Sequence, residues 1–372
     1  MSEKLRQSMK VNIGPQHPST HGVLRLIVDL KGELIKDCEP VIGYLHRGME
    51  KMAESRSFLQ YLPITDRIEY LSSFFCAEAF CGAVEKLSNI EVPKKAKYIR
   101  VLTMELNRIA SHLLWLGTFM LDLGASSPFF YCFRERESII SLFEELTGQR
   151  MMYNYHTFGG VKRDLTDDFL DKLKLFTDDF PSKIDEYENI ITKNPIFLKR
   201  TYGIGILSKK NALDYSITGP NLRASGVALD LRKQKPYLVY DELEFEVPNR
   251  KYGDSWNRYF VRIQEMRESL KIVEQCAKWL SENKDGEYKN PDVKPIAIKP
   301  PAGMVINNIE APRGLLSCVL YSDGTNKPLR VKWRTPSFYS VQVLPTLIKN
   351  HMFSDVMAIF GSLDVILPEV DR

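Results

Sequence analysis

The chain has no Cys-x-x-Cys pair, although it contains six cysteines. Zinc ribbons and most iron-sulfur sites need closely spaced thiolates, so the sequence offers neither kind of site. Scattered cysteines are typical of small core residues in a reducing compartment. They are Cys38, Cys76, Cys81, Cys132, Cys276 and Cys318.

A strong charge of either sign is also missing. The 372 residues carry a formal net charge of +4, and the isoelectric point is near 8.5. This balance is too mild to indicate nucleic-acid binding. With 44% hydrophobic and 26% charged residues, the composition is that of a globular protein long enough for two or three domains and a large core.

The first residues lack the apolar run of a signal peptide, and we expect no signal or transit peptide. Residues 109–133 carry a single formal charge, at Asp122, and are long enough to cross a bilayer. Gly124 and Pro128 interrupt this stretch, and an acid lies in its middle. These features favour a helix buried in a protein bundle over a transmembrane span.

Hydrophobic periodicity predicts the elements of the fold. Alternation over 23–42 predicts a hairpin that turns at Lys31-Gly32. Apolar residues that recur every three or four positions predict long helices over 66–87, 94–123, 134–146, 167–193 and 259–282. Short β-rich runs follow at 202–207, 243–247, 317–321 and 329–333, with a linker at 284–303 and a final helix near 341–359.

These elements predict an α+β protein with a dominant helical bundle. We divide it into an N-terminal α+β region over residues 1–60, a helical bundle over 61–200 that helix 259–282 rejoins, and an α+β region made of 201–258 and 284–372.

Two imidazoles lie in one short segment, Gly14 to Gly22. His17 and His21 alternate there with Pro15 and Pro18, which make the turn stiff and non-helical. Three interpretations compete: the histidines fill a loop, they bind a metal, or they handle protons or a ligand. The metal pair is disfavoured because the turn holds no carboxylate or thiol to complete a ligand set.

The predicted helix 94–123 carries further polar groups. Glu105, Arg108 and His112 share one face, a pattern more typical of a satisfied ion pair in a core than of a functional site. Asp122 lies on an apolar helix, so it must be paired or have a raised pKa, and either state makes it a candidate proton partner for an imidazole.

Tyr70 follows a candidate helix start, where Thr65 or Asp66 could cap the first turn. On this prediction Tyr70 lies one helical turn in and faces the histidine turn. A tyrosine here is more often a packing residue than a functional one. Arg47 could balance an anion in the same region.

Several longer motifs then occur in order along the chain. They are Gly14 to Gly22, Ile42 to Lys51, Leu222 to Gly226 with Asp230 to Lys233 and Pro236-Tyr237, Glu310 to Gly314, and Glu369 to Arg372. From about residue 11 to the last residue, the chain closely resembles the D subunit family of respiratory complex I, the proton-translocating NADH:quinone oxidoreductase. Several long motifs in register make this resemblance specific.

The resemblance implies a fold like that of the large subunit of nickel-iron hydrogenases, with a quinone pocket in place of the metal cavity. A hydrogenase would need two Cys-x-x-Cys pairs. The corresponding regions, Leu45 to Lys51 and Ser362 to Arg372, contain no cysteine, so this set cannot hold nickel.

The resemblance also implies roles for individual residues. His21 and Tyr70 match the family's partners of the quinone headgroup, and Asp122 matches the acid that hydrogen-bonds the histidine. Arg47 matches a residue beside the terminal iron-sulfur cluster, which a neighbouring subunit holds. No metal is expected on this chain.

The implied activity is that of the quinone-binding catalytic subunit of NADH:quinone oxidoreductase, active only within the complex. Its substrate would be ubiquinone or menaquinone, whereas FMN and the iron-sulfur clusters would lie on partner subunits. The expected partners are the subunit with the terminal cluster, the 30-kDa-type C subunit and the membrane subunit at the quinone channel, and no nucleic acid is expected. The expected location is peripheral, on the cytoplasmic face of the bacterial inner membrane. The alternative is the large subunit of a membrane-bound hydrogenase-like or ferredoxin-linked complex.

The chain departs from the family pattern at three positions. Met152 stands where the family frequently has a histidine thought to make the cluster potential depend on pH, so that dependence is in doubt here. Glu69 replaces the usual Asp before Tyr70, and Pro368 replaces a usual Gly near the end.

Overall fold

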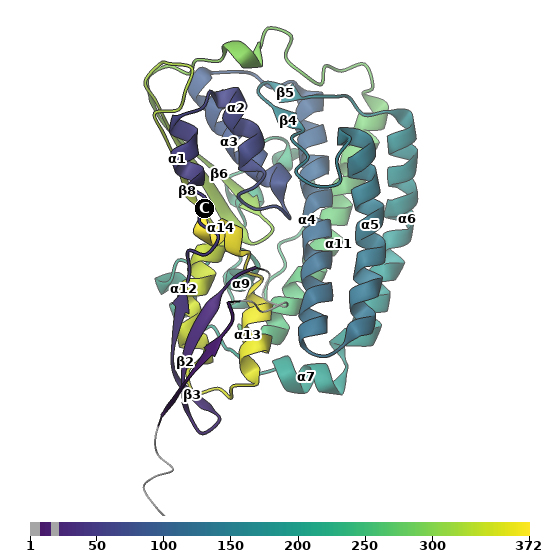
Figure 1. Ribbon diagram of the computed structural model, residues 1–372. Coiled ribbons are helices and arrows are strands. Elements are labelled where there is room, and N and C mark those ends of the chain that lie inside the picture. Colours follow the sequence, from purple (N-terminus) through teal and green to yellow (C-terminus); the bar gives the residue numbers. More distant parts are fainter. Residues whose placement is uncertain (1–7, 16–21) are drawn as a thin grey trace, which may run out of the picture.

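The computed structural model describes residues 8–15 and 22–372, and it places long helices on one side and small antiparallel sheets on the other (Figure 1). The N-terminal sheet has the order β1-β2-β3, a two-residue ladder joins β4 to β5, and a third sheet has the order β6-β7-β8. The strands are β1 Met9–Ile13, β2 Arg25–Lys31, β3 Leu34–Val41, β4 His156–Thr157, β5 Gly160–Val161, β6 Gly303–Ala311, β7 Gly314–Ser322 and β8 Arg330–Arg334.

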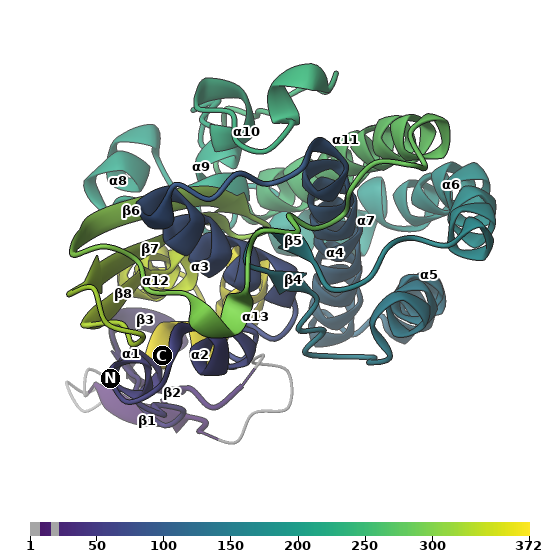
Figure 2. The same cartoon turned by 90° about the horizontal axis from the view of Figure 1, so that it is seen from above.

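Four long helices form the bundle, and α4 lies at its centre between α5 and α11 (Figure 2). Nearly every residue of α4 from Lys95 to Met120 is buried, which explains why its sequence is apolar on most sides. The long helices are α4 Lys94–Asp122, α5 Ser126–Thr147, α6 Asp167–Tyr187 and α11 Ser255–Glu282. In the part of the chain that the structure describes, no helix is long and apolar enough to cross a membrane.

Shorter helices connect the bundle to the sheets. On the N-terminal side these are α1 Met49–Glu54, α2 Phe58–Thr65 and α3 Ser73–Ser88. The middle of the chain adds α7 Pro195–Thr201, α8 Lys209–Asp214, α9 Gly219–Ala224 and α10 Leu231–Gln234, and a π-helical turn, Glu188–Thr192, extends α6. The end of the chain adds α12 Pro336–Ile348, α13 Asp355–Leu363 and α14 Leu367–Asp371.

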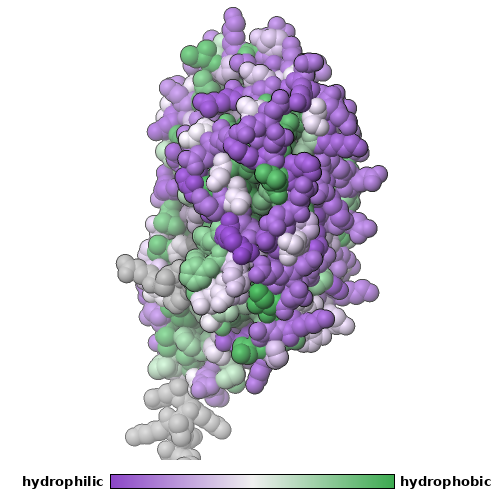
Figure 3. Space-filling model, turned by 90° about the vertical axis from the view of Figure 1, so that its right-hand side faces the viewer, coloured by the Kyte–Doolittle hydropathy of each residue, from purple (hydrophilic) through white to green (hydrophobic). Residues whose placement is uncertain are grey.

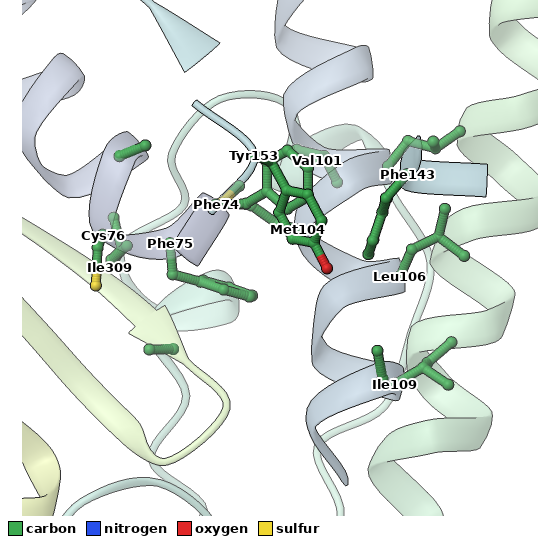
Figure 4. Packing of buried hydrophobic residues seen from close by; sticks show 14 of the residues in the cluster. Phe74, Phe75, Cys76, Val101, Met104, Leu106, Ile109, Phe143, Tyr153 and Ile309 are labelled. Atoms are coloured by element: carbon green, nitrogen blue, oxygen red, sulfur yellow. The ribbon is translucent and has the colours of Figure 1, made fainter. Parts of the chain in front are cut away.

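Aromatic rings fill the junction between α3, α4 and α5 (Figure 4). Phe74 stacks on Tyr153 with ring centroids 4.5 Å apart, and Phe143 tilts against the same tyrosine at 4.7 Å. All three rings are buried. Because buried aromatic pairs contribute both apolar area and specific ring contacts, this junction fixes how α3 begins against the bundle.

The α+β class, the N-terminal hairpin and the presence of the long helices are confirmed, although α5 and α11 begin earlier than predicted, at Ser126 and Ser255. The helix predicted over 66–87, however, begins only at Ser73, because α2 ends at Thr65 and turns occupy 66–72. The final helix is two helices, broken where Asn350 adopts a φ of 63°. Asn tolerates that conformation, and the N–H groups of Asn350 and Phe353 donate to the hairpin instead, at 2.8 and 2.9 Å from Ile35 O and Glu33 O.

The strands predicted at 202–207 and 243–247 are wrong. In the first run Gly203 and Gly205 have positive φ, which breaks an extended chain. In the second run no strand lies alongside among the described residues. The N–H groups of Glu244 and Glu246 instead donate to side chains of α11, Gln275 and Glu268, at 2.8 Å each.

The first residue of α9, Gly219, lies very close to the backbone of the β6–β7 turn. A Cβ on Gly219 would lie 2.5 Å from Gly314 Cα and 2.6 Å from Arg313 O, at a φ of +66°. We expect Gly219→Ala to lower the free energy of unfolding by several kcal/mol, on the order of the largest single-residue effects, because backbone would have to move. The measurement is urea unfolding followed by circular dichroism.

Gly203→Ala is the matched control, since Gly203 has a φ of +73° and nothing within 4 Å of its Cβ position. It should cost only the conformational strain, about 1 kcal/mol or somewhat more. Equal losses in both variants would show that the close approach contributes nothing.

Candidate functional site

Tyr70 lies in the turn between α2 and α3, not inside a helix as predicted. The Thr65 hydroxyl donates to Leu62 O at 2.7 Å and ends α2, while the Asp66 carboxylate accepts from Asn154 N at 2.7 Å, so neither residue caps α3. The Tyr70 side chain is half-buried. Burial first, and then the nearby Glu69 carboxyl, raise the pKa of Tyr70, so the phenol holds its proton firmly.

Arg47 is attached to the same turn. Its guanidinium is exposed and donates to Arg67 O at 2.6 Å, three residues before Tyr70. The loop before Arg47 is held from the other end of the chain, because the N–H groups of Gly43 and Leu45 both donate to the Asp371 carboxylate at 2.8 Å. The final motif therefore holds the loop that presents Arg47.

Asp122 is the last residue of α4 and is half-buried. It lies where α13 crosses α4, since a Cβ on Gly361 would be 3.6 Å from the Asp122 Oδ2 atom and only 2.8 Å from the Phe119 ring. Trp115 Nε1 donates to Gly361 O at 2.7 Å and fixes this crossing. A change in the charge of Asp122 would therefore act directly on the tight contact between α4 and α13.

The two histidines of the N-terminal turn, His17 and the predicted proton donor His21, lie outside the described residues. The pairing of His21 with Asp122, and the pocket between His21 and Tyr70, stay predictions. Among the described residues, no group of three or more His, Cys, Asp or Glu side chains is placed to hold a metal ion.

A buried ion cluster lies directly behind Tyr70. Arg313, from the β6–β7 turn, contacts Glu69 at 3.3 Å and Asp364 at 3.0 Å, and its Nε also donates to Asp364 O at 3.0 Å. All three side chains are almost fully buried. Burial raises the pKa of Glu69 and Arg313 opposes that shift, so the guanidinium is what makes a second buried carboxylate tolerable.

Glu369 adds a third carboxyl to this region. It forms a short hydrogen bond with the Ser337 hydroxyl and is buried. Burial raises the pKa of Glu369 to about 8, and the charge of Glu69 adds to the shift while Arg313 opposes it. Near neutral pH this carboxyl therefore keeps its proton most of the time.

The segment around Met152 completes the surface beside Tyr70. Met152 and Asn154 have φ values of 56° and 44°, and the Asn154 N–H bond to Asp66 ties the segment to the Tyr70 turn. Burial raises the pKa of Asp66 to about 7. Arg136, on α5, is close enough to Tyr70 to oppose the rise of its pKa.

Large apolar side chains are exposed on the same segments of the chain. They come from the segments that carry the site, and Figure 3 shows a partly green area beside the grey atoms. They are Ile42, Tyr44, Leu121, Phe130 and Met151.

The polar face of α4 is structural, as its spacing indicated. Glu105 pairs with Arg108 at 3.0 Å, which confirms the predicted ion pair, and Arg108 also donates to Glu310 O at 2.6 Å. His112 pairs instead with Glu265 of α11, at 2.9 Å. These groups belong to a buried ionic network that ties α4 to α11 and the β6 end.

Sequence reasoning missed Arg313, Asp364, Glu369 and Arg136. The motif Glu310 to Gly314 and the terminal motif contain two of them, so the signal was present. What it lacked was any indication that these distant segments meet behind Tyr70.

Comparison with known proteins gives a consistent result. Residues 122–372 match the family model described as the 49 kDa subunit of respiratory-chain NADH dehydrogenase. The chain is 49% identical to the D subunit of the NADH-quinone oxidoreductase of Geobacillus thermodenitrificans and 48% identical to that of Bacillus anthracis, each over 98% of this chain and 99% of the relative. It is also 50% identical to the H subunit of the chloroplast NAD(P)H-quinone oxidoreductase of Marchantia polymorpha, over 98% of both chains.

Glu369 makes stability depend on pH. Its folded-state pKa of about 8 lies above the ordinary value of 4.5, so between these pH values the folded state binds a proton that the unfolded state has lost. This contribution is fully present below pH 4.5 and is lost as pH rises to about 8. Glu369→Gln should remove it, so the stability of the variant relative to the parent should rise over this interval.

The measurement is urea unfolding at a series of pH values. Glu33→Gln, at an exposed position of the hairpin turn, is the control and should leave the pH profile unchanged. A Glu369→Gln profile parallel to that of the parent would contradict the assignment.

Proposed function

Because the chain belongs to the family of the 49 kDa subunit of respiratory-chain NADH dehydrogenase, we propose that it is the quinone-binding subunit of an NADH:quinone oxidoreductase. The observation that carries this proposal is the identity of about one half with D subunit relatives over nearly the whole chain. NADH oxidation and the electron-carrying groups would belong to partner subunits, and the activity to the assembled complex.

The quinone headgroup would lie between Tyr70 and His21. Reduction of a quinone by two electrons requires two protons, because a dianion buried away from water is very costly. Tyr70 would donate one proton to one carbonyl oxygen and His21 the other, while the electrons arrive from the partner that holds the terminal cluster. The half-buried phenol of Tyr70 keeps its proton at neutral pH because its pKa is raised, so it is present in the form that can donate one.

The Asp122 carboxylate would stabilise the positive charge of protonated His21 before the proton is transferred. After His21 gives up its proton, the Asp122 carboxylate would be left without that positive charge. Its position against Gly361 offers a route for the change, since α4 and α13 touch there too closely to absorb a shift locally. We propose that this contact begins the coupling of quinone reduction to proton translocation.

Arg47 and Met152 would face the subunit with the terminal iron-sulfur cluster. Both lie beside the Tyr70 turn, and exposed apolar side chains accompany them, as at a surface that a partner covers. Other proposed partners are the 30-kDa-type C subunit and the membrane subunit at the quinone channel. The assembly would bind ubiquinone or menaquinone and lie on the cytoplasmic face of the membrane.

The names of the relatives favour this function over that of a hydrogenase-like or ferredoxin-linked complex. Elemental analysis of the purified assembly for nickel separates the two. The chloroplast relative, named for NAD(P)H, shows that the electron donor is a property to determine on the assembly itself.

Loss of either proton donor should stop quinone reduction. In the assembled complex, we expect Tyr70→Phe and His21→Ala to lower NADH:quinone activity by about 10²-fold or more, as removal of a general acid does. NADH oxidation by an artificial upstream acceptor should persist. Tyr252→Phe, at an exposed tyrosine away from the site, is the control. Normal quinone turnover in both variants would defeat the site assignment.

Met152 should make the potential of the terminal cluster nearly independent of pH, because a thioether does not titrate. Met152→His should introduce a dependence that approaches ~59 mV per pH unit over the range where the imidazole titrates with the electron. His also tolerates the positive φ of this position. A redox titration followed by electron paramagnetic resonance measures both, and a steep dependence in the parent would mean that another group couples proton and electron.

A further inference from the structure

One end of the molecule, distant from the loop over 284–302, is unusually basic (Figure 1). Residues 189–213, which include α7, the following segment and most of α8, contain five basic residues and no Asp or Glu. They are Lys193, Lys199, Arg200, Lys209 and Lys210. We refer to these residues, with the apolar ones described below, as the basic end surface.

The five basic groups of this surface lack ion-pair partners among the residues that the structure describes. None of the five basic groups has a carboxylate partner within ion-pair distance among residues 8–15 and 22–372. Exposed lysines of the bundle differ, since Lys172 pairs with Asp168 and Lys174 with Asp178. These five charges are therefore available to an anionic partner.

Large apolar side chains are exposed between the lysines. Ile196 of α7 is 71% exposed, and Tyr202 and Ile206 are 58% and 56% exposed. Figure 3 shows green patches among hydrophilic residues towards this end of the molecule. The exposed apolar side chains of this surface also include Leu213, Met352, Phe353 and Leu34.

Backbone and side-chain bonds join these segments into one surface. The Arg200 guanidinium donates to Ser354 O at 2.9 Å, which connects α7 to the loop between α12 and α13. That loop pairs with the hairpin turn through a bridge between Leu34 and Met352. Lys349 adds a further basic group, and Lys36 of the hairpin donates to Asn350 Oδ1 at 3.4 Å.

The composition of this surface indicates the kind of partner. Protein interfaces are depleted in lysine and enriched in arginine, whereas four of the five basic residues here are lysines. Lysines mixed with single aliphatic and aromatic side chains are typical of surfaces that lie in the headgroup region of a membrane. Nucleic acid would match the positive charge, but it would not explain why isoleucines are exposed between the lysines.

We propose that the basic end surface binds anionic phospholipid headgroups, with Ile196, Ile206 and Phe353 inserted at the boundary of the acyl chains. The proposal builds on the membrane-bound complex proposed above, but its test does not require that complex. The lysine ammonium groups would attract the phosphates, and the apolar side chains would leave water on contact.

The test is sedimentation of the purified full chain with vesicles. We expect binding to vesicles that contain phosphatidylglycerol, little binding to pure phosphatidylcholine, and release by salt. Each basic residue at an anionic surface contributes about fivefold to partitioning, so Lys193→Glu, Lys199→Glu and Lys209→Glu together should lower it by roughly 100-fold. Ile196→Ser with Ile206→Ser should weaken binding without removing its dependence on salt.

The matched control reverses three exposed lysines at the opposite end, Lys289, Lys294 and Lys299. That loop also exposes Ile296, but Asp285, Glu287 and Asp292 lie among its lysines, so its reversal should leave vesicle binding nearly unchanged. Circular dichroism checks that each variant folds. The proposal would be overturned if the parent chain did not bind anionic vesicles, or if both triple variants lost the same amount of vesicle binding. The first of these outcomes does not depend on whether a variant folds.

The assembled complex separates this proposal from the function. The triple variant Lys193→Glu, Lys199→Glu, Lys209→Glu should keep the NADH:quinone activity of the detergent-solubilised complex, because these residues lie outside the candidate quinone site. The result could also be that the parent chain does not bind vesicles and that this variant does not assemble into the complex. The surface would then bind a protein subunit, and the lipid proposal would be wrong.

Discussion

The contact of Arg313 with Glu69 and Asp364 is the interaction on which the site depends. It joins three segments that are far apart in sequence: the turn of Tyr70, the β6–β7 turn and the end of α13. Two carboxylates buried at this point would be very costly without the guanidinium between them, and removal of one partner of a buried pair typically costs about 3–5 kcal/mol. The geometry of Tyr70 is therefore set by electrostatics as much as by packing.

Local pattern explains the parts of the fold that sequence predicts well. Helices α4 and α11 bury apolar residues at helical spacing over many turns, and β2 of the hairpin alternates between buried and partly buried residues, so each can be recognised within its own segment. The turn at 66–72 cannot be recognised from its own segment. Its apolar residues, Ile68 and Leu71, continue the helical spacing into α3, and only the tertiary contact of Asp66 with Asn154 shows that the helix begins later.

The candidate site divides in the same way. Tyr70, Asp122 and Arg47 could be named because the family resemblance assigns a role to each of these positions. Arg313, Asp364 and Glu369 could not be assigned to the region behind Tyr70, since nothing in a linear pattern states which buried acid meets which buried base. Burial of charge is a tertiary property, and the sequence carries it only as an unexplained polar residue among apolar ones.

The placement of the six cysteines has a consequence for the redox chemistry proposed for this protein. All six are buried, and burial raises the pKa of their thiols, to about 12 even at Cys38. Since oxidants attack the exposed thiolate, peroxide formed near a half-reduced quinone would find no reactive sulfur of this kind. Beside the Tyr70 turn the thioether of Met151, which is 44% exposed, would be open to oxidation instead, and that damage is enzymatically reversible.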